Sequence, residues 1–175
     1  MGTIVSATGT NEETESMKLA SWNVNSVRAR LDRLVAWLAK ASPDVLCLQE
    51  LKAVDDDFPL EAVAELGYHA TVHGQKTYNG VAVLSRATPG ATVRRLADDD
   101  PQARFLDVTL GSLRVLCAYV PNGQEVGSDK WAYKLAWLAR LKRYLEKHHT
   151  PDERLVLCGD FNVARDDLDV ARPKD

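Results

Sequence analysis

Oxygen-bearing side chains stand at the ends of four apolar, strand-like runs of this chain. In chain order they are Asn23 in KLASWN, Glu50 in VLCLQE, Tyr119 in VLCAY, and Asp160 and Asn162 in LVLCGDFN. Because buried strands are rigid, polar groups at the ends of neighbouring strands can converge in one cleft while the strands stay paired. Amide, carboxylate and phenol oxygens suit a hard divalent cation and an anionic substrate. The set therefore favours a metal-dependent catalytic site.

A simpler explanation exists for each of these residues taken alone. Acidic and amide residues also follow strands merely to begin turns, and Gly-Asp pairs are common turn sequences. That explanation weakens when the residues are considered together. Asp160 and Asn162 are the most informative pair, because side chains two positions apart in an extended segment share one side of the chain.

The charge balance argues against a general polyanion-binding protein. The 175 residues are 45% hydrophobic and 27% charged, which fits one globular domain or part of a larger one. The formal net charge of -3 comes from Glu12, Glu13 and Glu15, so the remaining residues are neutral overall. Contact with nucleic acid must then depend on a local basic patch, for which Lys52 and Lys76 near the proposed cleft are candidates.

Cysteine usage and the absence of long apolar runs indicate a reduced, cytoplasmic protein without membrane contact. Cys47, Cys117 and Cys158 lie inside apolar runs at spacings unlike those of a zinc motif, so they are predicted to be core residues. No run approaches the length of about 18 apolar residues that a membrane span needs, and no signal-peptide pattern is present. Residues 1–16 are polar and aperiodic, which predicts a flexible leader before a single domain over residues 17–175.

Alternation of helical and strand patterns predicts a layered α/β fold. The predicted helices cover residues 26–40, 59–66 and 129–148. One side of the last helix is expected to carry Leu135, Leu138, Leu141 and Leu145. Short alternating runs between residues 68 and 116 predict several antiparallel strands. This order of elements favours sheets flanked by helices over a simple alternating parallel sheet.

The histidines are assigned structural positions. His73 is expected in a loop or at a strand end, because no partner for acid-base chemistry is visible in the sequence. His148 and His149 end the last predicted helix, where they are expected only to complement the helix dipole.

Six motifs in register resemble the exodeoxyribonuclease III and AP endonuclease branch of the endonuclease/exonuclease/phosphatase superfamily. They are WNVNSVRARL, PDVLCLQELK, DDDFPLEAVAELGY, HGQKTYNGVAVLSR, AYVPNG and LCGDFNVARDDLDV. The resemblance implies a four-layer α/β sandwich, with two packed mixed sheets flanked by helices. It also implies a Mg²⁺-dependent phosphodiesterase, with Mn²⁺ as a possible substitute, that acts on duplex DNA in base-excision repair. Such enzymes cleave 5′ to abasic sites and trim 3′ ends.

The resemblance also assigns roles to residues. Glu50 matches the principal metal ligand, and Asn23 matches the amide that orients this carboxylate and the metal. Asp160 matches the residue that orients or deprotonates the attacking water and is also expected to contact the metal. Asn162 is expected to hydrogen-bond the phosphate or the metal shell. Tyr119 matches the phenol that contacts the scissile phosphate. Lys76, Asn79, Asn122 and Gln124 are expected to line the DNA groove.

The main departure from the family is a C-terminal Ser-Asp-His motif that this sequence does not contain. We therefore expect a fold that is incomplete at its C-terminus, with about half of the second sheet absent. Two alternatives to an active nuclease follow. One is a catalytically incomplete fragment that binds DNA or a partner chain, and the other is a Mg²⁺-dependent phosphatase of small phosphoesters. A complete domain would be expected to be a monomer.

Overall fold

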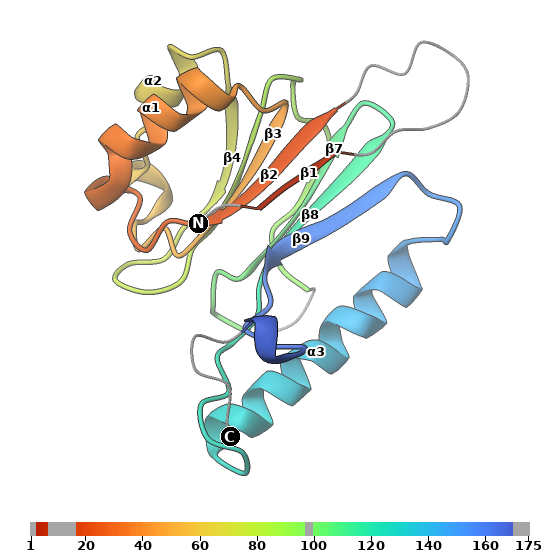
Figure 1. The fold of residues 1–175 in the computed structure, drawn as a ribbon. Helices are drawn as coiled ribbons and strands as arrows, with labels where there is room; N and C mark the ends of the chain where they lie inside the picture. Colours follow the sequence, from red (N-terminus) through yellow and green to blue (C-terminus); the bar gives the residue numbers. More distant parts are fainter. Residues whose placement is uncertain (1–2, 7–16, 97–99, 170–175) are drawn as a thin grey trace.

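Two mixed sheets packed face to face form the middle of the molecule (Figure 1). The structure is a computed structural model that describes residues 3–6, 17–96 and 100–169. In spatial order, the first sheet contains β1 (Thr3–Ser6), β2 (Lys18–Asn23), β3 (Val45–Gln49), β5 (Val81–Ser85) and β4 (His69–His73). The second contains β6 (Thr92–Val93), β7 (Phe105–Leu110), β8 (Leu113–Tyr119) and β9 (Leu155–Asp160). The pairs β2–β3 and β8–β9 are parallel, and the other pairs are antiparallel.

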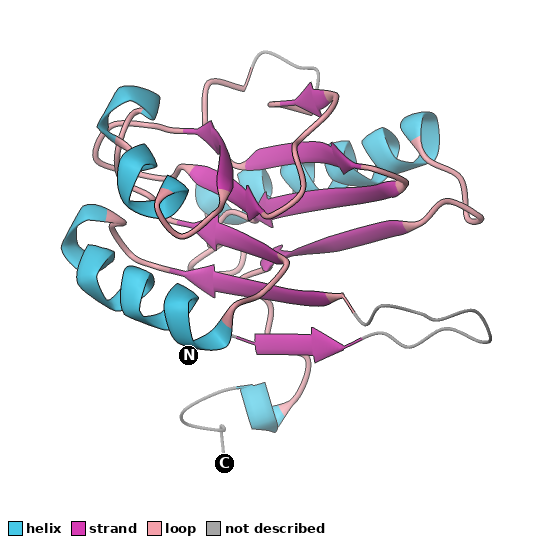
Figure 2. Cartoon of the chain, turned by 90° about the horizontal axis from the view of Figure 1, so that it is seen from above, coloured by secondary structure: helices cyan, strands magenta, loops and turns pink. Residues whose placement is uncertain are grey.

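The described helices cover the outer faces of the two sheets. They are α1 (Leu31–Ala41), α2 (Leu60–Ala64) and α3 (Asp129–His148), with short 3-10 turns η1 (Arg28–Arg30), η2 (Asp55–Asp57) and η3 (Asp167–Asp169). The helices α1 and α2 pack on the first sheet, and α3 packs on the second, as the turned view in Figure 2 also shows. The predicted four-layer α/β sandwich is therefore confirmed.

Strand alternation explains how three apolar layers form. On β3, Leu46 and Leu48 face the helices of the first sheet, whereas Val45 and Cys47 face the second sheet. Every residue of β3 is buried. The strand is thus held from both sides, which fixes the position of the segment that follows it.

The helix bounds follow from capping residues. The N–H of Ser42 donates to the carbonyl of Leu38 at 2.9 Å, and Ser42 adopts the left-handed conformation that ends α1 before Pro43. The Oγ of Ser128 accepts from the N–H of Trp131 at 3.2 Å and begins α3. The predicted helix over residues 129–148 is confirmed, and those over 26–40 and 59–66 are confirmed within a few residues.

The buried side of α3 differs from the predicted leucine stripe. Trp137, Leu141 and Tyr144 are the buried apolar residues of this helix, whereas Leu135 is 48% exposed. Aromatic rings remove more apolar area from water than leucine does, so the helix turns its aromatic side toward the sheet. The leucine prediction is therefore wrong for Leu135.

His149 has a larger structural role than the predicted dipole contact. Its side chain is 5% exposed, its Nδ1 lies 2.7 Å from Glu153 Oε2, and its Nε2 lies 3.1 Å from Asp107 Oδ2. Asp107 is fully buried on β7 and also accepts hydrogen bonds from Arg114 and from Tyr144 Oη. These contacts attach the C-terminal end of α3 to the second sheet.

Part of the predicted leader is a strand. Thr3–Ser6 pairs antiparallel with β2, so the expectation of a flexible segment is wrong for these four residues. The run Thr-Ile-Val contains three β-branched residues, which favour extended backbone beside an available sheet edge. Residues 1–2 and 7–16 of the predicted leader lie outside the described residues.

The strand β9 lies at the edge of the second sheet, where it pairs with β8. All six of its residues are half-buried, in contrast to the fully buried β3. The prediction of buried cysteines holds for Cys47 and Cys117, whereas Cys158 on β9 is half-buried. Across the part of the chain that the structure describes, no helix has both the length and the apolar character of a membrane span.

Candidate active site

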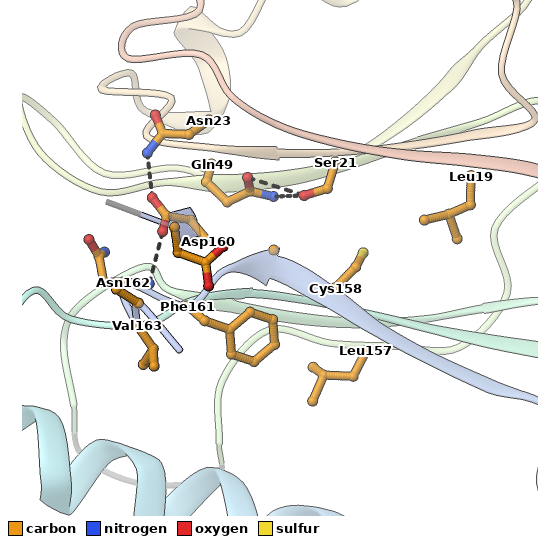
Figure 3. A pocket seen from close by; sticks show the side chains of 13 residues that line it. Leu19, Ser21, Asn23, Gln49, Leu157, Cys158, Asp160, Phe161, Asn162 and Val163 are labelled. Atoms are coloured by element: carbon orange, nitrogen blue, oxygen red, sulfur yellow. Dashed lines mark hydrogen bonds between the residues drawn. The ribbon is translucent and has the colours of Figure 1, made fainter. Parts of the chain in front are cut away.

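The predicted site residues meet where the two parallel strand pairs end. Asn23 at the end of β2 lies opposite Gln49 at the end of β3, and Tyr119 at the end of β8 lies opposite Asp160 at the end of β9. Glu50 follows β3 directly. Because the sheets pack face to face, these two sets of strand ends approach one another, and Figure 3 shows Asn23 pointing toward Asp160.

Hydrogen bonds between side chains join four of the five residues into one cluster. The Nδ2 of Asn23 donates to Glu50 Oε1 and to Asp160 Oδ2, at 2.8 Å each, and so links the first sheet to the second. The Oη of Tyr119 donates to Glu50 Oε1, also at 2.8 Å. Two carboxylates, an amide and a phenol therefore surround one point. The convergence expected from the sequence is present, and the chemical role of each residue is still a prediction.

Glu50 is held as a carboxylate. Its burial would raise the pKa, but hydrogen bonds from Asn23, Tyr119 and Lys52 outweigh that effect, so the pKa of Glu50 is lowered. Lys52 Nζ lies 3.1 Å from Glu50 Oε2 and adds an attractive charge. The backbone of Glu50 has φ of 56°, a conformation that non-glycine residues seldom adopt and that gathers at functional sites.

Tyr119 is held as a neutral phenol. Burial, followed by the hydrogen bond to Glu50 and the charge of Glu50, raises the pKa of Tyr119 to about 12. A phenol with this pKa keeps its proton at neutral pH, so Tyr119 can donate a hydrogen bond to an anionic group.

Asn162 is tied to its own turn. Its backbone N–H donates to Asp160 Oδ1 at 3.0 Å, and its Nδ2 donates to the carbonyl of Val120 at 2.9 Å. Its own carbonyl accepts from Lys134 Nζ. These contacts orient the Asp160 carboxylate, which Figure 3 shows between Asn23 and Asn162. Because Nδ2 of Asn162 is bound to Val120, Oδ1 is the side-chain atom of Asn162 that suits a metal shell.

Two hollows lie on either side of the cluster. The first, of about 800 Å³, opens between β2 and β9 and is drawn in Figure 3. We call the second, of about 380 Å³, the site cleft. Its lining residues are Glu50, Lys52, Tyr78, Asn79, Gln102, Arg104, Tyr119, Pro121, Asn122, Gln124, Lys130 and Tyr133.

Three of the four predicted groove residues line the site cleft. Asn122 and Gln124 are exposed there, whereas Asn79 is 8% exposed and donates its amide to Gln75 Oε1 at 2.9 Å. Lys76 is an exposed residue outside the cleft lining, so the structure does not bring it to the site.

Arg104 is a cleft residue that the sequence analysis missed. Its guanidinium lies over the ring of Tyr119, with Cζ 4.6 Å from the ring centroid. It stands one residue before β7, whose first residue Phe105 pairs with Ala118 on β8. The sequence shows a basic residue directly before a predicted strand. It does not show that Arg104 faces Tyr119, because that contact depends on the register between β7 and β8.

A family model supplies the identification. The model of the Endonuclease/Exonuclease/phosphatase family matches residues 20–175. The chain belongs to this family. The resemblance to the exodeoxyribonuclease III branch is confirmed by its relatives. Exodeoxyribonuclease III of Haemophilus influenzae is 38% identical over 161 residues, which cover 88% of this chain and 60% of that protein.

Solved structures of the family share the fold. An AP endonuclease from Archaeoglobus fulgidus is 38% identical, with a TM-score of 0.85, over 89% of this chain and 61% of that one. A 3′ phosphatase from Neisseria, solved with a product DNA hairpin, is 42% identical, with a TM-score of 0.83, over 86% and 60%. The chain thus spans about 60% of the length of the relatives it matches.

The family generally depends on a divalent metal, and the donor set of the cluster fits one. Among the described residues, no group of three or more His, Cys, Asp or Glu side chains could hold a metal. A zinc site normally needs such a group, whereas Mg²⁺ keeps several waters and often uses one or two carboxylates. Glu50 and Asp160, bridged by the amide of Asn23, provide that number.

Proposed function

We propose that this chain is the catalytic part of a Mg²⁺-dependent DNA phosphodiesterase that acts in the cytoplasm. Its reactions would be cleavage 5′ to abasic sites and trimming of 3′ ends in duplex DNA, and Mn²⁺ could replace Mg²⁺. The observation that carries the proposal is the cluster of Asn23, Glu50, Tyr119 and Asp160, built from the ends of four strands. Each of these residues offers a group that phosphodiester hydrolysis needs.

Glu50 and Asn23 would hold the metal. Glu50 is ionised, and Asn23 fixes both its carboxylate and that of Asp160 through one amide nitrogen. A bound Mg²⁺ would polarise a phosphate oxygen and offset the charge that develops on it. The hydrogen bonds of Asn23 orient the two carboxylates before any substrate arrives, so little reorganisation is needed during the reaction.

Asp160 and Tyr119 would act on the water and the phosphate. The carboxylate of Asp160 is oriented by Asn23 on one oxygen and by the Asn162 N–H on the other, a geometry suited to accepting a proton from an attacking water. Tyr119 carries a proton at neutral pH and points it at the centre of the cluster. A phosphate oxygen beside Glu50 would receive that hydrogen bond as its negative charge grows.

The site cleft and the relatives favour DNA over small phosphoesters. Lys52 and Lys130 give the cleft positive charge, while Asn122 and Gln124 offer exposed amides. Cationic and amide groups along a groove are what binding to a nucleic-acid backbone needs. The relatives named above are an exodeoxyribonuclease, an AP endonuclease and a 3′ phosphatase bound to product DNA.

A second candidate is a catalytically incomplete fragment that binds DNA or a partner chain. Among the described strands, β9 pairs only with β8, and this favours the candidate, because an unpaired strand edge invites pairing with another chain. This candidate predicts DNA binding without turnover.

The test is a nicking assay on a duplex with one abasic site, run beside an intact duplex and a small phosphomonoester. We expect nicking with Mg²⁺ and none with a chelator. Glu50→Gln should retain the fold and lose the activity, whereas the exposed Glu61→Gln serves as the matched control. Phosphate release from the small ester would favour a phosphatase, and binding of the abasic duplex without nicking would favour the fragment. Unchanged activity of Glu50→Gln across a magnesium titration would remove Glu50 from the metal site.

A further inference from the structure

Arg104 makes three contacts that fix Tyr119, and this inference rests on the function proposed for that residue. The guanidinium lies over the phenol ring, 4.6 Å from its centroid. Its Nη1 donates to the carbonyl of Tyr119 at 3.1 Å. The carbonyl of Arg104 in turn accepts from the N–H of Tyr119 at 2.8 Å. Ring, carbonyl and amide of the tyrosine are therefore all held by one residue of the neighbouring strand end.

A chain of side-chain amides fixes Arg104 itself. Gln102 Oε1 accepts from Arg104 Nε at 2.6 Å and from Asn79 Nδ2 at 3.3 Å. Asn79 also donates to Gln75 Oε1, which accepts from the N–H of Ala103 at 2.9 Å. The guanidinium is thus oriented by the loop between β4 and β5, and its orientation is set before a substrate enters the cleft.

The stacked geometry suits a positioning role. A tyrosine at a strand end can rotate about two side-chain bonds, and rotation about Cα–Cβ moves the phenol oxygen away from Glu50. A planar guanidinium stacked on the ring restricts both rotations, because it covers one face and is itself held by Gln102. Arg104 also places a positive charge beside the point where phosphate charge would develop.

We propose that Arg104 is a positioning residue that acts through Tyr119, by holding the phenol in line with Glu50. The competing explanation is that Arg104 binds a DNA phosphate directly. The two explanations differ in what they predict for turnover, for the salt dependence of binding and for the environment of the phenol.

A double-mutant cycle measured on turnover separates positioning of Tyr119 from direct phosphate binding. Arg104→Met should lower kcat about tenfold and leave KM nearly unchanged, because ground-state binding is retained. In a Tyr119→Phe background the same substitution should have less than about a twofold effect, since the two residues act as a unit. Arg104→Lys keeps the charge without the planar stack and should restore only part of kcat. A full additional loss in the Tyr119→Phe background would overturn the proposal.

The matched control is Arg86→Met. Arg86 stacks on Tyr68 with the same 4.6 Å separation, but it follows β5 at the end of the first sheet away from Glu50. Its removal should leave kcat and KM unchanged. A loss equal to that of Arg104→Met would mean that removing any stacked guanidinium disturbs the enzyme, and would overturn the specific role of Arg104.

The salt dependence of DNA binding tests whether Arg104 contacts a DNA phosphate. Loss of one phosphate contact reduces the slope of log K against log salt by about one. We expect that reduction for Lys130→Met, which removes an exposed cleft cation, and no change of slope for Arg104→Met. A slope reduced by about one in Arg104→Met would assign the residue to phosphate binding instead.

A spectroscopic measurement tests the contact between Arg104 and Tyr119 independently of catalytic activity. With 3-fluorotyrosine in place of tyrosine, the fluorine signal of residue 119 is the one lost in Tyr119→Phe. Arg104→Met and Gln102→Leu should both shift that signal, whereas Arg86→Met should shift only the signal of Tyr68. An unmoved Tyr119 signal would refute the inference alone. Failure of the proposed function would instead appear as absent cleavage with the signal shift intact.

Discussion

Tyr119 and Asp160 belong to different strands of the second sheet, and each is bound to a residue of the first. We predict that Tyr119→Phe lowers turnover by about one to three orders of magnitude, because a preorganised donor to the developing charge is lost. Asp160→Asn should cost more, since an amide cannot accept the proton of the water. DNA affinity should change little in either variant, and steady-state kinetics with a binding assay would measure both effects.

Tyr68→Phe is the matched control for the phenol. Tyr68 is buried, and its Oη donates to the carbonyl of Pro43 at 2.7 Å, so this variant also loses one buried hydrogen bond. It should destabilise the fold by about 1 kcal/mol and leave turnover per folded molecule unchanged. Wild-type turnover in Tyr119→Phe or in Asp160→Asn would show that the role assigned to that residue is wrong.

His73 makes stability depend on pH. It is the last residue of β4, as expected from the sequence, and is 8% exposed, with Nδ1 3.2 Å from the carbonyl of Phe105. Burial lowers its pKa, and the hydrogen bond to Phe105 opposes that effect only in part. The unfolded chain therefore binds a proton more readily, so the contribution of His73 is complete above an unfolded pKa of about 6.5 and is lost as pH falls through the folded pKa.

The measurement is urea unfolding of the metal-free protein at pH 7.5 and at pH 5.5. The free energy of unfolding should fall more in the wild type than in His73→Gln, whose side chain does not titrate and can still donate to Phe105. Equal falls in the two proteins would rule out His73 as the source.

Residues whose place in the cluster depends on their position along one strand could be predicted from the sequence. Asn23, Glu50, Tyr119 and Asp160 follow apolar runs, and the end of a run is visible in a linear pattern. Arg104 could not be predicted in this way, because its contact with Tyr119 arises from the register between β7 and β8. The side chains of Asn79 and Asn162 were expected to face ligands, but their amide nitrogens are bound to neighbouring chain segments, which only the folded loops reveal.

At the scale of elements, the junction between β8 and β9 controls where Asp160 lies. Gly159 has φ of 145° and pairs with Ala118, and a Cβ on it would meet the Ala118 carbonyl oxygen at 1.8 Å. We predict that Gly159→Ala destabilises the fold by about 3 kcal/mol and abolishes cleavage, because the strands must move apart next to Asp160. Thermal unfolding and the nicking assay would measure the two effects.

The control for this variant is Gly111→Ala. Gly111 also has a positive φ, of 60°, but a Cβ there meets nothing within 4 Å. Gly111→Ala should therefore destabilise the fold by only about 1 kcal/mol, which is the cost of placing alanine at a positive φ, and should leave cleavage intact. Similar losses for the two variants would mean that backbone conformation, and not the contact with Ala118, governs the junction.

Long periodic elements were predictable and short ones were not. The 20 residues of α3 begin at a capping serine, and their bounds follow from the sequence. The four-residue β1 and the two-residue β6 carry too few side chains to show a period, and both are formed by pairing with a neighbouring strand. The position of Leu135 on α3 was misjudged because packing on the sheet selects the aromatic side of the helix.

At the scale of the whole molecule, the open hollow between β2 and β9 exposes one thiol of three. Cys158 lines that hollow, whereas Cys47 and Cys117 are fully buried between the sheets. Contacts with the other two thiols, together with burial, raise the pKa of Cys47 well above its usual value, which further lowers its reactivity. We predict that a thiol reagent modifies one cysteine rapidly in the native protein and the other two only on unfolding.

Cys158→Ser should remove the rapid phase and leave the slow one. Any strand that pairs with the free side of β9, whether from the same polypeptide or from another, should slow the rapid phase by covering the hollow. Three equally fast thiols would contradict the packing of the two sheets, and three equally slow ones would show that β9 is already covered in solution.

The hydrogen bond from Asn23 to Asp160 joins residues 137 positions apart in the chain. During synthesis on the ribosome, the nascent polypeptide therefore has no assembled cluster until β9 has left the exit tunnel and joined β8. The carboxylates of Glu50 and Asp160 stay apart until β9 has joined β8. A nascent chain that carries β1 to β8 without β9 therefore holds Glu50 and Tyr119 in place but lacks the second carboxylate of the cluster.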